Sequence, residues 1–164
     1  LTCGWLLGMR AALLSLLLVP LASARLIQVD TDGELRAALP NLRAGDTLRL
    51  APGRYQGGHR VTGLHGSARK PIIIEGIPGK PPRFENGKTG LHLTNCSHLT
   101  LRHLRFSGQR INGLNLDDGG DSATPAHHLV LENLHISEIG SGGNHDAFKL
   151  SGVDDFIVRG CTIT

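Results

Sequence analysis

The sequence has few aromatic residues, no run of basic residues and no cysteines at metal-binding spacing. Aromatic side chains make up 4% of the 164 residues. Nucleic-acid-binding surfaces usually carry basic runs interleaved with aromatic residues, and such runs are missing here. The three cysteines, Cys3, Cys96 and Cys161, include no CxxC pair. We therefore expect neither nucleic acid nor a cysteine-bound metal as a partner.

An uninterrupted apolar segment of membrane-spanning length is also missing. A span needs about 20 continuous apolar residues, and Arg10 interrupts the N-terminal one. Residues 1–24 instead predict a secretory signal, because Arg10 precedes an apolar run at 11–21 and small residues at 22–24 form a cleavage site. The residues before Met9 are interpreted as extra translated sequence. We expect a secreted, periplasmic or surface-displayed protein without stable membrane insertion.

The charge balance is mild. The net charge of +3 becomes +2 if Arg10 leaves with the signal, a value that tolerates an acidic polysaccharide without requiring one. Cys3 would leave as well. Cys96 and Cys161 are interpreted as small inward-facing hydrophobic residues, although export would permit a bridge between them.

Short apolar pairs recur three times between Gly90 and Thr164. In each pair two large apolar residues flank one outward residue, which indicates a strand with one buried face. Aligning Leu101, Leu131 and Val158 gives steps of 30 and 27 residues, within the range of repeats that stack into solenoids. Strands this short are stable only when they pair with their counterparts in the next repeat.

Three strands per repeat predict three parallel sheets around one core. The fold class is therefore all-β, a right-handed parallel β-helix covering residues 25–164, with the handedness taken from the general rule for parallel crossovers. Thr31 and Glu34 form a capping box before apolar residues at helical spacing, which predicts a helix that caps the first coil. Because the chain stops at Thr164 directly after a strand, we expect the N-terminal part of a longer, monomeric β-helix.

The inward positions divide among the three sheets. The first sheet takes Leu48/Leu50, Ile72/Ile74, Leu99/Leu101, Leu129/Leu131 and Phe156/Val158. The second sheet takes Tyr55, Phe84, Leu104/Phe106, Leu134/Ile136 and Cys161/Ile163. The third sheet takes Val61, Leu91/Leu93, Leu114/Leu116 and Phe148/Leu150.

Three motifs carry a resemblance to a known group of proteins. They are Arg43-Ala-Gly-Asp-Thr-Leu-Arg-Leu-Ala-Pro-Gly-Arg-Tyr55, Lys70-Pro-Ile-Ile-Ile-Glu-Gly76 and the coil Leu99-x-Leu-x-x-Leu-x-Phe106. With them the chain resembles the front part of secreted β-helix polysaccharide lyases, nearest in pattern to chondroitinase B and the alginate lyases, and more distantly to pectate lyases and mannuronan epimerases. The resemblance implies β-elimination on a uronate-containing polysaccharide. A uronate C5-epimerase and a non-catalytic glycan-binding or surface module remain alternatives.

A polar column on the outer face of the third sheet is the candidate floor of a site. His92, Asn115 and Lys149 occupy equivalent positions in successive coils, roughly 5 Å apart. We assign Lys149 as the catalytic base and His92 and Asn115 to substrate binding. The alternative is that Lys149 is an ordinary outward strand residue.

Two insertions would form the walls of this site. The first lengthens the segment between Leu116 and Leu131 and contains three aspartates among glycines, a hard-oxygen donor set suited to Ca²⁺. We predict calcium ligands at Asp117, Asp118, Asp121 and Asp146. Such a cation would acidify the sugar proton next to the uronate carboxylate. The alternative is an ordinary solvated turn, in which Asp and Gly are also common because of their backbone preferences.

The second insertion lengthens the segment between Ile136 and Phe148. It supplies Asn144 as a substrate-binding residue and His145 as an alternative base or as the acid for the leaving oxygen. The alternative is that Asn144 and Asp146 only cap backbone groups of the loop. His127 and His128, in the return to the next strand, are interpreted as structural or exposed.

Overall fold

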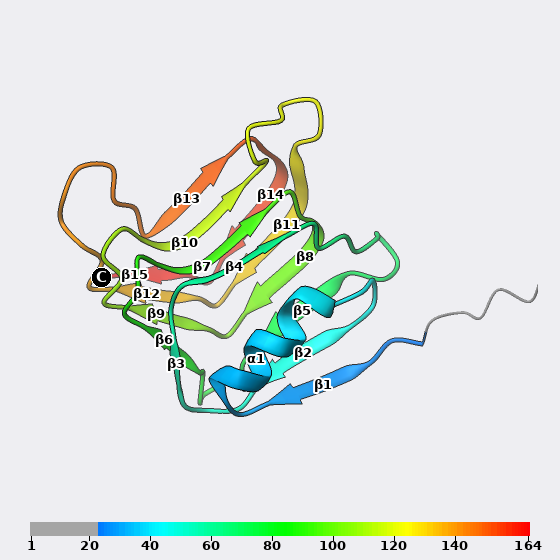
Figure 1. The fold of residues 1–164 in the computed structure, drawn as a ribbon, viewed down its shortest axis with the longest axis horizontal. Helices are drawn as coiled ribbons and strands as arrows, with labels where there is room; N and C mark the ends of the chain where they lie inside the picture. Colours follow the sequence, from blue (N-terminus) through cyan, green and yellow to red (C-terminus); the bar gives the residue numbers. More distant parts are fainter. Residues whose placement is uncertain (1–22) are drawn as a thin grey trace, which may run out of the picture.

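The computed structural model describes residues 23–164, which wind through three parallel sheets with one short α-helix near the N-terminus (Figure 1). Nearly all of the predicted signal, residues 1–24, lies outside the described residues. No helix within the described part of the chain is long and apolar enough to cross a membrane.

Each coil contributes one strand to each sheet. The first sheet contains β1 (Leu26–Val29), β2 (Thr47–Leu50), β5 (Ile72–Glu75), β8 (Ser97–Arg102), β11 (Ala126–Glu132) and β14 (Val153–Arg159), in that spatial order. The second contains β3 (Arg54–Gln56), β6 (Arg83–Glu85), β9 (Arg105–Ser107), β12 (His135–Ser137) and β15 (Thr162–Ile163). The third contains β4 (His59–Thr62), β7 (Thr89–Thr94), β10 (Asn112–Asp117) and β13 (Phe148–Ser151).

The register agrees with the repeat found in the sequence. Leu101 pairs with Leu131, and Leu131 pairs with Val158, in parallel neighbouring strands. The apolar pairs of the first and third sheets lie on the strands to which they were assigned, and in the second sheet Leu104, Leu134 and Cys161 directly precede β9, β12 and β15, so the three-sheet solenoid is confirmed. Residues about thirty positions apart in the chain therefore become lateral neighbours.

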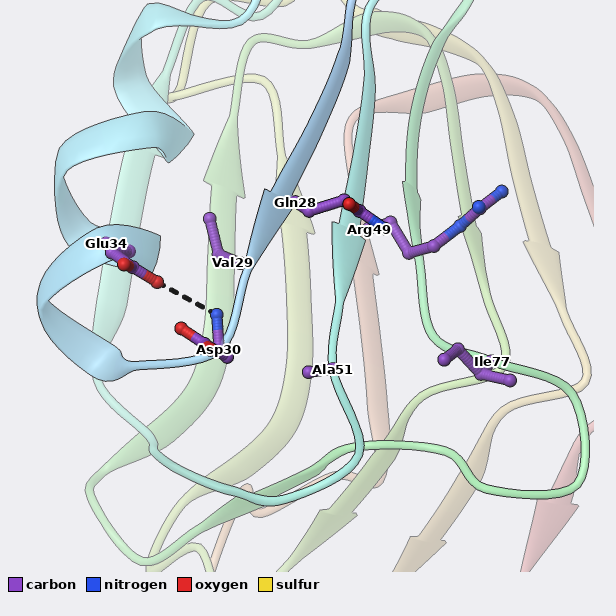
Figure 2. Close-up of a pocket in the computed structure, with 7 residues that line it drawn as sticks. All are labelled: Gln28, Val29, Asp30, Glu34, Arg49, Ala51 and Ile77. Atoms are coloured by element: carbon purple, nitrogen blue, oxygen red, sulfur yellow. Dashed lines mark hydrogen bonds between the residues drawn. The ribbon is translucent and has the colours of Figure 1, made fainter.

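The predicted cap is helix α1 (Asp32–Ala38), followed by the 3-10 turn η1 (Leu39–Asn41). The Thr31 side chain accepts a hydrogen bond from the Glu34 backbone N–H at 3.2 Å. The Glu34 carboxylate reaches back to the backbone N–H of Asp30 at 2.9 Å, one residue before the N-cap (Figure 2). Leu35 and Leu39 are 1% exposed, so the helix buries its apolar face against the first coils.

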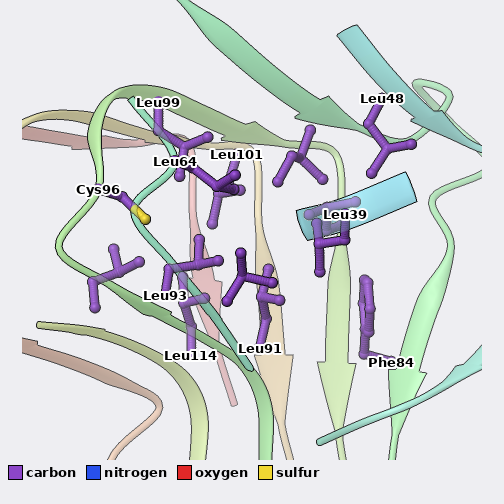
Figure 3. Packing of buried hydrophobic residues seen from close by; sticks show 14 of the residues in the cluster. Leu39, Leu48, Leu64, Phe84, Leu91, Leu93, Cys96, Leu99, Leu101 and Leu114 are labelled. Carbon is purple, nitrogen blue, oxygen red and sulfur yellow. The ribbon is translucent and has the colours of Figure 1, made fainter. Parts of the chain in front are cut away.

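The core is a continuous column of buried leucine, isoleucine and aromatic side chains (Figure 3). Within it, Phe84 lies between Tyr55 and Phe106 of the neighbouring coils, with ring centroids 5.9 and 5.1 Å away. Such offset contacts add to the burial of apolar area. The Tyr55 hydroxyl donates to the carbonyl oxygens of Val29 and Ala51, which satisfies its polar end inside the core.

Both described cysteines are free thiols. Cys96 is buried among the core residues and Cys161 packs against the core from a partly exposed position. Their interpretation as inward-facing small residues is confirmed.

A ladder of alternating charge runs across the first sheet. Register places its members in neighbouring coils in the order Arg49, Glu75, Arg102, Glu132 and Arg159. Glu75 has ion pairs on both sides, at 2.7 Å to Arg49 and 2.6 Å to Arg102. The last pair, Glu132 with Arg159, is longer at 3.3 Å and more exposed.

Candidate functional site

The outer face of the third sheet carries two adjacent polar columns. Register across β4, β7, β10 and β13 aligns the first column, Arg60, His92, Asn115 and Lys149. The second column is Thr62, Thr94, Asp117 and Ser151. The predicted alignment of His92, Asn115 and Lys149 is confirmed.

Arg60 is a member of the column that the sequence interpretation missed. It pairs in register with His92 and is exposed. The alternation His59-Arg60-Val61-Thr62 signals an outward position at 60, but only Val61 was used to place this coil. Neighbouring strands are about 4.8 Å apart, so the backbones of Arg60 and Lys149, three strands apart at the two ends of the column, are separated by about 14 Å. No ion pair joins either cation to a carboxylate within residues 23–164.

A hydrogen-bonded network joins the two columns at their centre. The His92 Nε2 atom lies 2.6 Å from Asp117 Oδ2, and the Asn115 amide nitrogen lies 3.1 Å from the same oxygen. A contact of 2.6 Å requires a proton between the two atoms, so His92 Nε2–H donates to the carboxylate. The Asn115 amide nitrogen also lies 2.8 Å from His92 Nε2, but this contact is not a further hydrogen bond, because both nitrogens then carry their protons. Asn115 donates a second bond to Asp117, and this arrangement fixes the orientation of the imidazole.

The environment of Asp117 keeps its carboxylate ionised. Burial by itself raises the pKa of Asp117, but the hydrogen bonds from His92 and Thr94 and the backbone N–H of Gly119 outweigh it. The net result is a pKa below the ordinary value of an aspartate, since each donor favours the charged form. The centre of the polar face therefore holds a fixed negative charge between two cationic ends.

Asn115 has one further feature of note. It is 9% exposed, and its Oδ1 atom is buried with no hydrogen-bond partner within the described residues. Buried amide oxygens are normally paired, and an unpaired one costs about 1–3 kcal/mol. The protein itself covers this oxygen, and exchange of the amide nitrogen and oxygen would place an oxygen 2.8 Å from His92 Nε2, so the unpaired atom does not by itself indicate a ligand.

The two insertions border this face at opposite ends of its strands (Figure 1). Residues 118–125 connect β10 to β11, and residues 138–147 connect β12 to β13. In Figure 1 they appear as the yellow and orange loops, and they stand apart rather than meeting across β10 and β13. The face between them is an open sheet surface.

The aspartates of the first insertion bind their own turn. Asp118 Oδ1 accepts from the Gly120 N–H at 2.8 Å. Asp121 accepts from the Ala123 N–H at 3.0 Å and from the Thr124 hydroxyl at 2.9 Å. These contacts are those of an ordinary Asx turn. As placed, the carboxylates satisfy turn donors and do not converge on one point, so they do not fit a resident calcium ion.

Asp146 lies far from that turn. Its position matches Asn112 in the register that pairs Leu114 with Phe148, while Asp117 matches Ser151. Five residues along a strand correspond to about 16 Å, too far for Asp146 and Asp117 to bind the same ion at the 2.3–2.6 Å typical of calcium. The backbone N–H of Asp146 instead donates to the Asn112 side chain at 3.0 Å.

His145 and Asn144 lie in the second insertion. The His145 Nδ1 atom is 3.1 Å from the Gly140 carbonyl oxygen and 3.2 Å from the Gly142 nitrogen, so this ring nitrogen helps to fix the shape of the loop. Asn144 is exposed. Both residues lie at the edge of the polar face where β13 begins, on the side opposite Asp117.

No family profile matches the chain, and no curated protein matches it. Solved structures do. An alginate lyase from Paenibacillus sp. strain FPU-7 superimposes with a TM-score of 0.68 at 25% identity, covering 83% of this chain and 43% of the other. A GH136 lacto-N-biosidase from Eubacterium ramulus gives 0.61 at 16%, covering 77% and 30%. A PL6 family alginate lyase gives 0.54 at 21%, covering 76% and 19%.

These matches define the class of fold. The chain is a three-sheet parallel β-helix that resembles polysaccharide lyases and a glycosidase in structure. It spans less than half the length of each of these structures. At such identities the likeness concerns the scaffold, and fold alone does not determine the reaction.

Proposed function

We propose that this chain is part of a secreted, carbohydrate-active β-helix protein, a lyase that cleaves a uronate-containing polysaccharide by β-elimination. The likeness to an alginate lyase at 25% identity supports the class of substrate. The observation that carries the proposal is the arrangement of Arg60 and Lys149 at the two ends of a column whose centre is a preorganised polar network. A polyanionic chain laid across the coils would meet the Arg60 guanidinium at one end and, at the other, Lys149, which must give up its proton before it acts as the base.

The reaction assigns a task to each group. A base removes the proton on the carbon next to the uronate carboxylate, the electron pair forms a carbon–carbon double bond, and the glycosidic oxygen leaves and takes up a proton. We assign the base to Lys149. Because Arg60 stands about 14 Å away, we assign to it the pairing of the carboxylate of another uronate residue along the chain, which its planar guanidinium matches in geometry. His92 and Asn115 bind sugar hydroxyls. Asn144 binds the chain at the edge, and His145 protonates the leaving oxygen.

Whether the proposed lyase needs calcium is a separate question from the roles of the residues above. The Asp117 carboxylate accepts from His92 of the neighbouring coil, and those of Asp118 and Asp121 accept from their own turn, so no step is assigned to a cation. If substrate and calcium together reorganise this turn, activity on a uronate polymer will fall when a chelator is added and recover with Ca²⁺. Activity that is unchanged by chelation would remove calcium from the proposal.

The test is an assay for the unsaturated product on a panel of uronate polymers, read by ultraviolet absorbance. We expect turnover by the full-length protein and a loss of at least about 100-fold in Lys149→Met, the effect typical of removing a general base. Lys80→Met is the matched control, because Lys80 is an exposed lysine in a turn outside the third sheet. Absence of product on every polymer would refute the lyase.

A non-catalytic glycan-binding module is the second candidate. The open face between the two insertions favours it, because no loop covers the polar column (Figure 1). Such a module would retain binding to a uronate polymer in the absence of product, and Arg60→Gln would weaken that binding. A C5-epimerase would instead incorporate solvent deuterium into the polymer without forming unsaturated ends.

A further inference from the structure

Three histidines gather on the first sheet, away from the polar column. His98 belongs to β8, and His127 and His128 belong to β11. Each offers one ring nitrogen, and these three atoms all lie within 4.8 Å of one another. No other group of three or more histidine, cysteine or acidic side chains in residues 23–164 is placed to share a metal ion.

The spacing of the nitrogens is close to that of a coordination sphere. His127 Nδ1 and His128 Nδ1 are 2.8 Å apart, and the ring centroids of His98 and His128 are 4.5 Å apart. Two imidazole nitrogens at 2.0–2.1 Å from a tetrahedral Zn²⁺ would be about 3.3 Å apart. Small side-chain rotations would therefore bring the three nitrogens to this spacing without moving the strands.

The backbone builds this cluster by repeating a strained conformation. His98, His128 and Asp155 occupy the same position in three successive coils, with φ of 48°, 55° and 51°. Non-glycine residues in the left-handed region each cost about 1–2 kcal/mol. The repeat stacks the residues above one another, and Asp155 Oδ2 lies 3.8 Å from His128 Nδ1. A carboxylate is therefore available next to the His128 imidazole.

The cluster can be reached by an ion from solvent. His98 and His127 are half-buried and His128 is exposed, and His98, His128 and Asp155 line a surface hollow of about 680 Å³ on the outer face of the first sheet.

We propose that His98, His127 and His128 bind a divalent first-row transition metal of the Zn²⁺ type, with Asp155 as the fourth ligand. Imidazole nitrogen suits Zn²⁺, Cu²⁺ and Ni²⁺, whereas Ca²⁺ requires oxygen donors. The ion would link β8, β11 and β14. Because His127 lies two residues after the 118–125 insertion, it would also anchor the base of that loop. The proposal is independent of the proposed lyase activity.

The test is a titration of untagged full-length protein with Zn²⁺, in competition with a chromogenic chelator and without substrate. We expect one tightly bound equivalent and a rise in Tm on addition of Zn²⁺. His98→Asn and His128→Asn should each weaken binding about 100-fold, a loss at the upper end of what perturbing a metal site costs. Asparagine tolerates the left-handed backbone, so these variants remove the ligand without adding strain.

His135→Gln is the matched control, because His135 is a partly exposed histidine on the second sheet. Its affinity for Zn²⁺ should equal that of the unaltered protein, whereas Asp155→Asn should lose about 10-fold. Co²⁺ in place of Zn²⁺ should give the visible absorption of a tetrahedral site. Equal loss in His135→Gln, unchanged affinity in the His98 and His128 variants, or an equal rise in Tm with Ca²⁺ would each overturn the proposal.

Discussion

The His92 imidazole and the Asp117 carboxylate are 25 residues apart in the chain, and their side chains meet at 2.6 Å. They meet because β7 and β10 are neighbours in the third sheet and place the two side chains diagonally on its outer face. The contact exists only in the stacked coils. It therefore links the winding of the chain directly to the chemistry proposed for its surface.

Replacing this carboxylate should impair activity more than stability. Asp117→Asn keeps the shape of the side chain but removes the charge that holds the His92 N–H. We expect kcat/KM on a uronate polymer to fall about 10–100-fold, mainly through a higher KM, since Asp117 positions His92, the residue assigned to bind the sugar. Product absorbance under steady-state conditions measures this, and a thermal melt shows whether the fold is intact.

Asp121→Asn is the comparison for that prediction. Asp121 belongs to the same insertion, but its carboxylate contacts only Ala123 and Thr124 of its own turn. Its kcat/KM should stay within about twofold of the unaltered protein. Equal losses in the Asp117 and Asp121 variants would show that the insertion as a whole matters, and the positioning role of Asp117 would be wrong.

The sequence was sufficient to predict the winding because each coil repeats the same inward positions. Apolar pairs such as Leu129/Leu131 alternate with outward residues, and a shift by one residue would expose the whole set. Register follows from that constraint. Once the coils are aligned, the neighbours of Asn115 in the sheet are fixed as well, so the polar column could be predicted without coordinates.

The contacts made by the insertions could not be predicted in the same way. Residues 118–125 and 138–147 have no repeat, so nothing in the sequence pattern determines which groups their polar side chains contact. Asp121 could bind an ion or its own backbone with the same sequence. The histidine cluster was missed for another reason: His98 and His128 lie at an irregular, left-handed position, where period-2 alternation does not apply.

Glu75 should contribute stability that depends on pH. Burial raises its pKa, but the ion pairs with Arg102 and Arg49 outweigh it and leave the pKa below the ordinary value. The ionised form is therefore favoured by folding. Its contribution is complete above the unfolded pKa, near 4.3, and is lost as pH falls through the folded pKa. Glu75→Gln should cost about 1.5–3 kcal/mol at pH 7 and much less at pH 3, measured by urea unfolding.

Glu132→Gln tests the same ladder at an exposed position. Glu132 pairs with Arg159 at 3.3 Å, and the arginine side chain is 60% exposed. Exposed pairs contribute about 0–1 kcal/mol, so this variant should unfold close to the unaltered protein at both pH values. A cost equal to that of Glu75→Gln would contradict the role of burial in the ladder.

The aromatic stack should be the most sensitive part of the core. Phe84 is 1% exposed and contacts Tyr55 and Phe106 in the coils on either side. Phe84→Ala should reduce the free energy of unfolding by about 3–5 kcal/mol through lost burial and the cavity left behind. Phe156→Ala, at a side chain that is 48% exposed, should cost about 1 kcal/mol or less. Urea midpoints would rank the two, and the reverse order would contradict the stack.

The two cysteines of residues 25–164 should differ sharply in reactivity in a protein from which residues 1–24 have been removed. Burial raises the pKa of Cys96 to about 11, and its side chain is 1% exposed. At pH 8 about one thiol in a thousand would be ionised at such a pKa, and the thiolate is the reactive form. Cys161 is partly exposed, so a thiol reagent should modify it within minutes, whereas Cys96 should react only after the protein unfolds.

The Cys161→Ser variant should therefore lose the fast phase of modification, whereas Cys96→Ser should leave that phase unchanged. In denaturant both thiols should react at similar rates, because the difference arises from the fold. Rapid modification of Cys96 in the folded Cys161→Ser variant would show that the coil opens at Cys96 more readily than its burial implies.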